Sequence, residues 1–325
     1  MVAHMRAGEG QWVEAVNRDG SPKEGVGASV NGWLYAAYGL SEYFRASKNK
    51  EDQDIVFETL WASLRQYDQL NYGGVSDTGG MSPDVSLNGL REIGHSTQIL
   101  ELLTDFLEAT RNRRLEEVAD EHATYLAESF FNPKLGIANE YLNHDYTRIS
   151  GYDDYMQTGN AIAASWALVR EARRSKDTKL FDDAAVMLNR YLEIGWDYIF
   201  EGFGDGDFFT FDGPDRTRDM LYRRKSLKSH CELMTALLHI WEFTGEDWAK
   251  TWYERVRAFS LKKFAEETPV WPLELDRFGR PAVYGGRHEK QRDIFYLPRY
   301  LMLNILSLDR ILDKMGKLED IASPG

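Results

Sequence analysis

The chain has 325 residues, of which 43% are hydrophobic and 13% aromatic, so it can bury a substantial core and is not a disordered protein. A net charge of −13 works against nucleic-acid or anionic-membrane binding, because phosphate contacts need clustered Lys and Arg. Neither a membrane-spanning apolar run nor a signal peptide is recognisable, and the single Cys231 excludes an intramolecular disulfide and a cysteine-built zinc site. These features favour a cytoplasmic protein.

Apolar residues recur at helical spacing along most of the chain, and alternating strand-like runs are rare. The pattern predicts helices at 30–47, 51–70, 92–111, 113–130, 157–175, 178–197, 226–244, 246–265 and 295–315. Short connections join the helices of a pair, and long aromatic and Gly-rich segments join successive pairs at 71–91, 131–156, 198–225 and 266–294. Such a tandem of helical hairpins is typical of a bundle, a solenoid or a toroid.

The long segments contain short hairpin-like pieces, and long loops on one face usually carry function. Hairpins are predicted within 136–146 and 270–281. Two tight turns share a pattern, in which an apolar segment is followed by Asn17–Gly20 in one case and by Asp276–Gly279 in the other. Gly245 is expected to end the helix at 226–244, and Pro298 to lie in the first turn of the last helix.

Several kinds of chemistry find no support in the sequence. The Gly-rich stretch 202–207 lacks the preceding strand and the spacing of a phosphate loop, and no metalloprotease or serine-hydrolase motif is present. No metal ion and no cofactor are therefore predicted. Carboxylates are plentiful, but a glycosidase needs two of them at a defined separation, which sequence cannot supply.

Aromatic and polar side chains are concentrated in the long loops and at nearby helix starts. Sugar rings stack on aromatic planes while acids, amides and Arg bind their hydroxyls, so a sugar is the expected ligand. The candidate binding residues are His95, Gln98, Glu140, Tyr141, Asn160, Trp166, Phe208 and Trp271. Packing in the core is the alternative for each aromatic residue.

A basic stretch runs from Arg216 through Lys225 to Lys228, and it is either a solvated loop or a site for an anionic sugar. His230 and Glu232 flank Cys231 early in a helix and therefore diverge around its axis. Each is a candidate pocket group, with a helix-end hydrogen bond as the alternative.

The segments 227–256, 273–281 and 294–312 resemble the N-acylglucosamine 2-epimerase superfamily, which includes cellobiose 2-epimerases and mannose isomerases. The earlier segments 11–22, 39–49 and 158–177 fit the same pattern in the same order. The resemblance implies an all-α fold, an α/α toroid of twelve helices with short β-hairpins in its long loops, here as one domain over residues 1–325. Nine predicted helices suggest that the first helices are lacking, and the faces left uncovered motivate a homodimer.

The resemblance also implies two catalytic histidines that move a proton beside the sugar carbonyl, and this chain departs from them. Their positions hold Asn160 and Tyr296, and the glutamate of the family's Gly-His-x-x-Glu motif is replaced by Ala163. Arg299 is retained, and Glu232 matches an acidic position. Asparagine carries no titratable proton, and the pKa of tyrosine starts near 10, so the two-histidine mechanism is absent.

The leading hypothesis is a sugar 2-epimerase or aldose–ketose isomerase with a rebuilt acid–base set. Tyr296 is the expected acid or base, Glu232 the orienting carboxylate and Arg299 the group that anchors the carbonyl. His230 or His95 is the substitute for a lost histidine. Two alternatives remain open, namely a non-catalytic sugar-binding relative and a different reaction on the same scaffold, such as that of a lyase or hydrolase.

Overall fold

The computed structural model describes residues 2–13, 15–23, 30–70, 89–150, 152–205, 207–209, 224–266, 271–284, 287–288 and 295–322. The chain divides into two compact units. Unit 1 comprises Met1–Asn132, Ala138–Asp153 and Arg170–Thr178, and unit 2 comprises Pro133–Ile137, Asp154–Val169 and Lys179–Gly325. Within the described ranges, none of the helices has both the length and the apolarity needed to cross a membrane.

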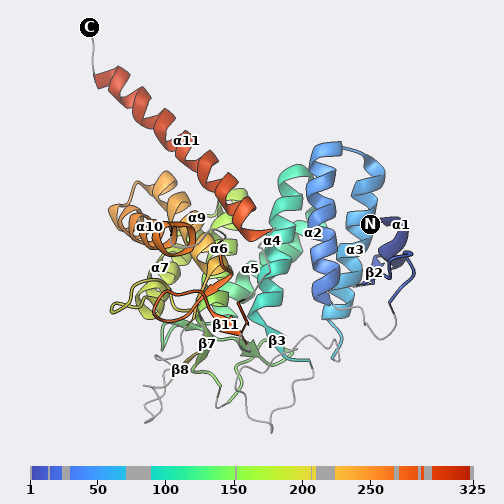
Figure 1. The fold of residues 1–325 in the computed structure, drawn as a ribbon. Helices are drawn as coiled ribbons and strands as arrows, with labels where there is room; N and C mark the ends of the chain where they lie inside the picture. Colours follow the sequence, from blue (N-terminus) through green and yellow to red (C-terminus); the bar gives the residue numbers. More distant parts are fainter. Residues whose placement is uncertain are drawn as a thin grey trace. The chain divides into compact units, whose positions relative to one another are not determined.

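Unit 1 is built on antiparallel helices, with α2 packed against both α3 and α4, and α4 packed against α5 (Figure 1). Its elements are α1 (Val2–Met5), β1 (Arg6–Gly8), β2 (Gln11–Trp12), α2 (Val30–Ser47), α3 (Lys50–Tyr67), β3 (Arg91–Glu92), α4 (Ile93–Ala109), α5 (Arg113–Thr124), the π-helix η1 (Tyr125–Phe130), β4 (Phe131–Asn132) and β6 (Tyr141–Leu142). Asn49 and Asn112 cap the starts of α3 and α5, since each side chain accepts a hydrogen bond from a first-turn amide.

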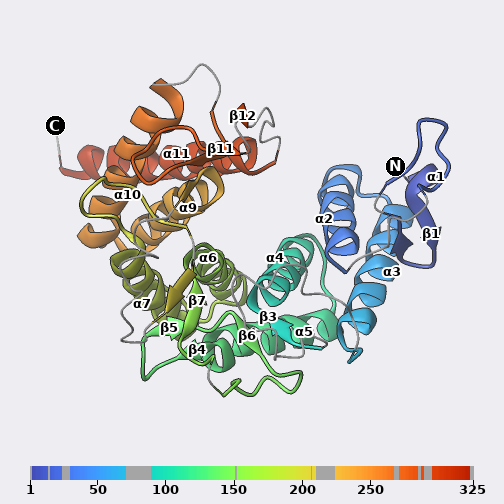
Figure 2. The same cartoon turned by 60° about the horizontal axis from the view of Figure 1, so that its bottom comes forward.

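Unit 2 has α9 packed between α10 and α11 (Figure 2). Its elements are β7 (Tyr155–Gln157), α6 (Thr158–Ser175, whose last six residues belong to unit 1), α7 (Thr178–Gly195), β8 (Asp207–Phe209), β9 (Lys225–Ser226), α9 (Leu227–Thr244), α10 (Asp247–Ser260), the π-helix η2 (Leu261–Glu266), β10 (Glu274–Leu275), β11 (Val283–Tyr284), β12 (Arg287–His288) and α11 (Tyr296–Ala322). Gly245 ends α9 with a φ of 73°, in the left-handed region that favours glycine, as predicted.

The strands of the described residues form short antiparallel pairs, and one predicted hairpin is wrong. Within 136–146, β5 (Ile137–Ala138) pairs with β4, whereas β6 pairs with β3. The two strands of this segment therefore do not pair with each other. The residues between them, Asn139 and Glu140, are fully buried.

Three five-residue turns have the same hydrogen-bonding pattern. In each, the first amide donates to the carbonyl of the fifth residue, over 2.8 Å in Asn17–Ser21, 2.9 Å in Asn143–Thr147 and 2.7 Å in Asp276–Arg280. The fourth residue has a positive φ in every case, which is 87° at Gly20, 62° at Tyr146 and 78° at Gly279. The first and third turns confirm the predicted shared pattern. The second was not predicted, because a tyrosine stands where the others have glycine.

Candidate functional site

Three residues predicted to be catalytic lie together in unit 2, where α9 packs against α11. We call Lys228, Glu232, Tyr296, Arg299 and Tyr300 the α9–α11 cluster. Lys228 and Glu232 are four residues apart on α9, and Tyr296 and Tyr300 are four residues apart on α11, so each pair lies on one face of its helix. Three members of this cluster were predicted from the sequence, whereas Lys228 and Tyr300 were not predicted as site residues. Their spacing of four from Glu232 and Tyr296 was the signal that could have found them.

The carboxylate of Glu232 is the buried centre of the cluster, with 2% of the residue exposed. Tyr300 Oη donates to Glu232 Oε1 over 3.3 Å, and Lys228 Nζ lies 3.9 Å from the same oxygen. A buried carboxylate is costly unless it is paired and hydrogen-bonded, and these two groups provide that compensation. Glu232 is therefore held in one orientation by residues of two helices.

Aromatic rings and cations surround this carboxylate. The rings of Tyr296 and Tyr300 are parallel within 5°, with centroids 6.3 Å apart. Lys228 Nζ lies 5.3 Å from the centroid of Tyr296, and Arg299 Nη1 donates to Tyr300 Oη over 3.4 Å. The cluster thus combines one carboxylate, two phenols and two cations. Carboxylates and phenols can transfer protons, and cations can stabilise negative charge on a ligand, so the cluster has the groups that acid–base chemistry needs.

A buried ion pair fixes the start of α9, just before Lys228. Lys225 is fully buried on β9, and its Nζ lies 3.3 Å from Asp197 Oδ2 and donates to the carbonyl of Arg277. Burial lowers the pKa of Lys225, with Asp197 opposing the shift. Burial alone would raise the pKa of Asp197, but the amides of Phe200 and Ile199 together with Lys225 bring it below its usual value. This lysine of the basic stretch is therefore a structural ion-pair partner rather than part of a solvated loop.

The ring of His230 is enclosed by backbone partners. Its Nδ1 donates to the carbonyl of Ser226 over 2.7 Å, and its Nε2 accepts from the amide of Phe203 over 3.1 Å. The residue has no exposed surface, and burial lowers its pKa to about 4. The geometry favours the helix-end hydrogen bond that the sequence left open as an alternative for this residue, which joins the first turn of α9 to the segment after α7.

Unit 1 holds a second polar cluster, which contains His95. His95 Nδ1 on α4 lies 3.6 Å from Glu92 Oε2, on the strand that leads into the helix. Burial lowers the pKa of His95 to about 4 and raises that of Glu92 to about 7. Of these two groups, Glu92 is the one that changes charge near neutral pH, a property frequent among functional acids and bases. Glu92 was not predicted as a site residue, because a single glutamate among many carries no distinguishing sequence pattern.

Four predicted binding residues, His95 among them, lie on the elements around Glu92. Tyr141 on β6 is paired with Glu92 in the register of the β3–β6 ladder. The carbonyl of Glu140 accepts from the amide of Ile93 over 3.0 Å, and the whole residue is buried. Gln98 is half-buried on α4, about one turn after His95. The structure thus brings His95, Glu140 and Tyr141 to the start of α4.

The remaining predicted binding residues of unit 2 lie on α6, on β8 and before β10. Asn160 Nδ2 donates to Gln157 Oε1 over 3.2 Å at the start of α6. Trp166 is fully buried and packs edge-on against His239, with ring centroids 4.9 Å apart, so it is a core residue in this structure. Trp271 is half-buried just before β10. Phe208 lies on β8 opposite Met156, and its side chain lies outside the described residues.

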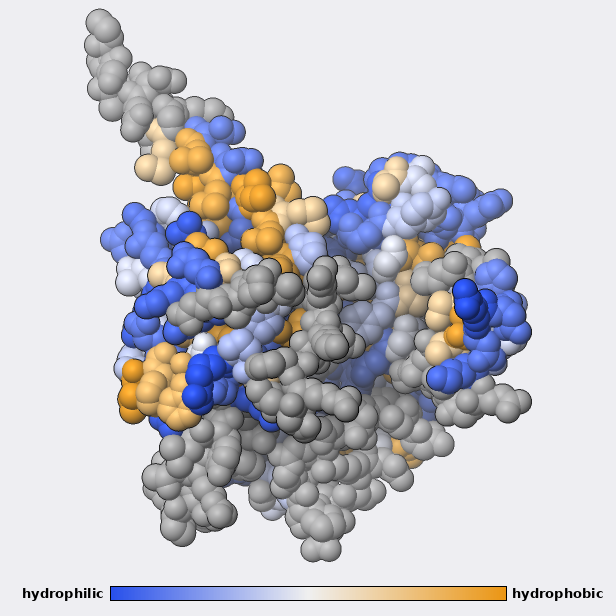
Figure 3. Space-filling model, in the orientation of Figure 1, coloured by the Kyte–Doolittle hydropathy of each residue, from blue (hydrophilic) through white to orange (hydrophobic). Residues whose placement is uncertain are grey.

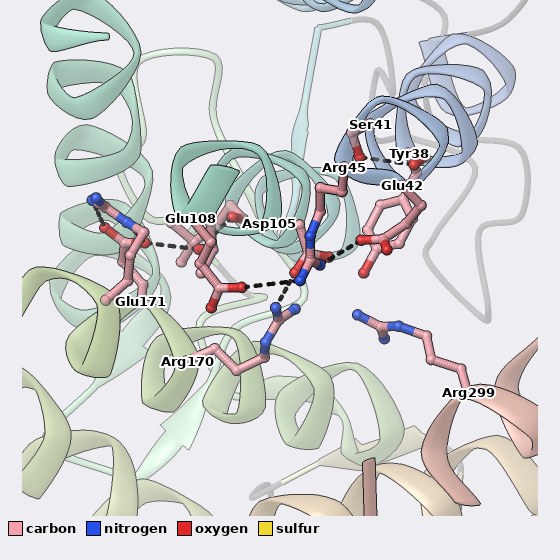
Figure 4. A network of polar contacts seen from close by, with 12 residues as sticks. Tyr38, Ser41, Glu42, Arg45, Asp105, Glu108, Arg170, Glu171 and Arg299 are labelled. Carbon is pink, nitrogen blue, oxygen red and sulfur yellow. Dashed lines mark hydrogen bonds and ion pairs between the residues drawn. The ribbon is translucent and has the colours of Figure 1, made fainter. Parts of the chain in front are cut away.

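An ion-pair network ties together three helical segments of unit 1 (Figure 4). Arg170 pairs with Asp105, and Arg45 lies 2.8 Å from Glu42 and 3.8 Å from Glu108. Burial alone would lower the pKa of Arg170, but the adjacent Asp105 raises it well above its usual value. Each carboxylate here has a cationic neighbour, which assigns these residues a role in packing α2, α4 and the end of α6.

Comparison with known proteins relates the chain to sugar-converting enzymes. Residues 1–290 match the family model of N-acylglucosamine 2-epimerase (GlcNAc 2-epimerase). A search of curated proteins gave no match. Similar solved structures include a D-mannose isomerase with 14% identity and a TM-score of 0.71, covering 96% of this chain and 77% of that one. A cellobiose 2-epimerase from Spirochaeta thermophila has 17% identity and a TM-score of 0.70, with coverages of 95% and 77%.

A sugar epimerase from a ruminal bacterium is similar to the same degree, with 14% identity, a TM-score of 0.70 and coverages of 93% and 77%. At such low identity these structures show the fold alone, and that fold is the predicted α/α toroid.

Proposed function

This chain belongs to the N-acylglucosamine 2-epimerase family, and we propose that it is a cytoplasmic isomerase that moves a proton at the carbon beside the carbonyl of a small sugar. The observation that carries the proposal is the α9–α11 cluster, in which Tyr296, Glu232 and Arg299 lie on facing helices beside Lys228. The family's activity requires an acid–base group next to a sugar carbonyl, and this cluster supplies such groups without histidine.

In the proposed reaction, the phenolate of Tyr296 removes the proton from C2 of the open-chain sugar. The C2–H electrons form a C1–C2 double bond, and the carbonyl electrons move onto oxygen to give an enediolate. Arg299 donates hydrogen bonds to this oxygen and stabilises the charge that develops on it. Returning the proton from Tyr296 to C1, with the hydroxyl proton of O2 passing to O1, gives the ketose. The epimer requires a second acid that delivers a proton to the opposite face of C2.

Lys228 supports Tyr296 as the base, because a cation beside a phenol favours its charged form. Its Nζ lies 5.3 Å from the ring centroid of Tyr296 and 3.9 Å from Glu232 Oε1. Glu232 is already held by Tyr300 and is the residue we propose to orient Lys228. This assignment gives the carboxylate a positioning role and leaves the proton transfer to tyrosine.

The test is proton exchange in heavy water followed by proton NMR, with a panel of neutral, N-acetylated and acidic sugars. We expect the wild-type protein to exchange the C2 proton of at least one sugar. Tyr296→Phe is expected to lower that rate by about 10²-fold or more while sugar binding persists, because general acid–base groups contribute on that order. Tyr43→Phe is the matched control, since Tyr43 on α2 is a solvent-exposed tyrosine.

Lys228→Met refines the test, because loss of the cation is expected to lower the rate and move the pH–rate profile to higher pH. Full activity of Tyr296→Phe would contradict the assignment of the base. Selective broadening of sugar signals without exchange would identify a non-catalytic binding relative. Conversion of a sugar with its C2 proton retained would identify a different reaction, such as that of a lyase or hydrolase.

A further inference from the structure

Two helices of unit 1, α3 and α5, line a cavity of about 560 Å³. Cavities that hold small molecules have volumes of about 300–1,000 Å³, so this one is large enough for such a ligand. The wall on α3 is one face of that helix, and the wall on α5 is its first turn together with its cap. The lining residues are Asp54, Phe57, Glu58, Trp61, Asn112 and Arg114.

Two aromatic rings give the cavity its apolar surface. Phe57 and Trp61 are both half-buried and lie one turn apart on α3. Phe57 packs edge-on against Phe106, with ring centroids 5.1 Å apart, and Arg114 Cζ lies 4.2 Å from the ring centroid of Trp61. These contacts hold both rings in place before a ligand binds, which lowers the entropy cost of binding.

The polar groups of the lining are available to a ligand. Asp54 is exposed, and its carboxylate has no ion pair or hydrogen bond within the part of the chain that the structure describes. Arg114 contacts Trp61 but pairs with no carboxylate of the described residues. Asn112 Oδ1 accepts from the amide of Leu115 over 3.2 Å, and its Nδ2 remains a donor for another partner. The cavity therefore offers both an acceptor and donors.

The charges of the lining favour a neutral ligand. Glu58 is paired with Arg6, which leaves Asp54 and Arg114 as one charge of each sign. A charged ligand would be attracted by one of these two groups and repelled by the other, and it would lose hydration without a net gain. A neutral ligand with several hydroxyl groups avoids this cost, because each hydroxyl can donate to the carboxylate and accept from the guanidinium or the amide.

The lining of this cavity differs from the apolar surface elsewhere on the chain. Figure 3 shows an apolar stripe along α11, to which leucine, isoleucine and methionine side chains contribute. Such a surface offers few hydrogen bonds to a polar ligand. The cavity instead combines aromatic rings with a carboxylate, an amide and a guanidinium group, which together can bind the C–H faces and the hydroxyls of a sugar ring.

We propose that the cavity between α3 and α5 is a non-catalytic binding site for a neutral sugar. It shares no residue with the α9–α11 cluster, so the proposal goes beyond the proposed reaction and does not depend on it.

The test is fluorine NMR of the full chain labelled with 5-fluorotryptophan, in which the Trp61 resonance is the one that is absent from Trp61→Phe. Titration with D-glucose is expected to shift this resonance saturably, with a dissociation constant of about 1–10 mM, as for a site with few polar contacts. D-Glucosamine and D-glucuronate carry a positive and a negative charge on the same kind of ring. Each is expected to bind about threefold more weakly than glucose, or weaker still.

Arg114→Ala and Arg113→Ala separate the cavity from its surroundings. Arg114 lines the cavity, whereas Arg113 pairs with Glu117 and has a side chain that is 92% exposed. Arg114→Ala is expected to weaken glucose binding about tenfold, because a hydrogen bond from a charged donor is lost. Arg113→Ala is the matched control and is expected to bind like the wild type. Both variants are expected to keep the wild-type circular dichroism spectrum and the wild-type rate of C2 proton exchange.

Access to the cavity in the full chain is measured with a soluble gadolinium chelate, which broadens the resonances of accessible groups. We expect it to broaden the Trp61 resonance in the absence of sugar, and a resonance that stays sharp would show a covered cavity and overturn the proposal. So would the absence of a saturable shift at about 100 mM glucose, which is tenfold above the expected dissociation constant, or equal binding by Arg114→Ala. Tighter binding of either charged sugar would contradict the neutral class. Glucose binding at Trp61 without any C2 proton exchange would support this proposal and count against the proposed reaction alone.

Discussion

The ion pair of Lys225 and Asp197 is expected to stabilise unit 2 measurably, although both residues are buried. At 3.3 Å, two unit charges attract by roughly 5 kcal/mol at an effective dielectric constant of 20. The cost of removing both charges from water offsets part of this attraction. Arg277 Nε, 3.7 Å from the same carboxylate oxygen, partly replaces Lys225 when it is lost. Lys225→Met is therefore expected to cost about 3 kcal/mol, at the lower end for breaking a buried pair.

A double-mutant cycle isolates the interaction itself. Lys225→Met, Asp197→Asn and the double variant are to be unfolded in urea at pH 7 and 25 °C. Equal slopes of the free energy of unfolding against urea concentration would show that the unfolding transitions of the variants are comparable. We expect the double variant to lose about 2 kcal/mol less than the sum of the single variants, because each single change strands a buried partner. The Asp197 pKa is lowered in the folded protein, so its contribution is present above the ordinary value near 4 and is lost below it.

A coupling energy below about 0.5 kcal/mol would refute this reasoning, since distant and independent sites add within that margin. In that case, the two side chains would be neighbours without interacting, and β9 would be fixed mainly by its ladder with β10. Arg224→Lys is the matched control for a change of a basic residue in the same segment. Arg224 lies 3.3 Å from Glu274 in a half-exposed pair, whose contribution is about 1 kcal/mol or less.

Two further predictions concern pH. Because the pKa of His230 falls to about 4 on folding from an ordinary value near 6.5, its contribution is complete above pH 6.5 and declines as the pH falls to 4, by about 3 kcal/mol in total. His230→Asn should therefore cost more at pH 7 than at pH 4.5, and an equal cost in urea unfolding at both values would contradict this. Burial raises the pKa of Glu92 to about 7, so its charge opposes folding above that pH. Glu92→Gln should stabilise the protein by up to about 3 kcal/mol at pH 8 relative to its effect at pH 4, and a pH-independent effect would argue against a buried charge.

The positions of the helices could be predicted from the sequence, because the spacing of apolar residues and the capping residues are local features. The helix α2 has the predicted bounds, and α6 differs from its prediction by one residue. The helices expected at 113–130 and 246–265 instead change to π-helix after Thr124 and after Ser260. Apolar spacing could not reveal this change, because a six-residue segment spans little more than one turn of either kind of helix.

The candidate site was predictable only in part, because its partners are distant in sequence. Family resemblance pointed to Glu232, Tyr296 and Arg299, and their proximity depends on how α9 packs against α11. The burial of Lys225 could not be foreseen, since its partner Asp197 lies 28 residues earlier. A charge run in sequence is typical of a solvated segment, and only packing decides which of its members is enclosed.

The three five-residue turns share one hydrogen-bonded geometry, so their tips can in principle be exchanged. Because each turn closes its own hydrogen bond between the first and fifth residues, its geometry does not depend on the helices on either side. A protein engineer could transplant the tip of one turn onto another, or lengthen it, without altering the register of the flanking segments. Two of the turns are tethered to the rest of their unit. The ring of Tyr146 stacks on Tyr125 with centroids 3.7 Å apart, and the carbonyl of Arg277 accepts a hydrogen bond from the buried Lys225. Asn17–Ser21 is therefore the turn to use as a port for tags, labels or new recognition loops.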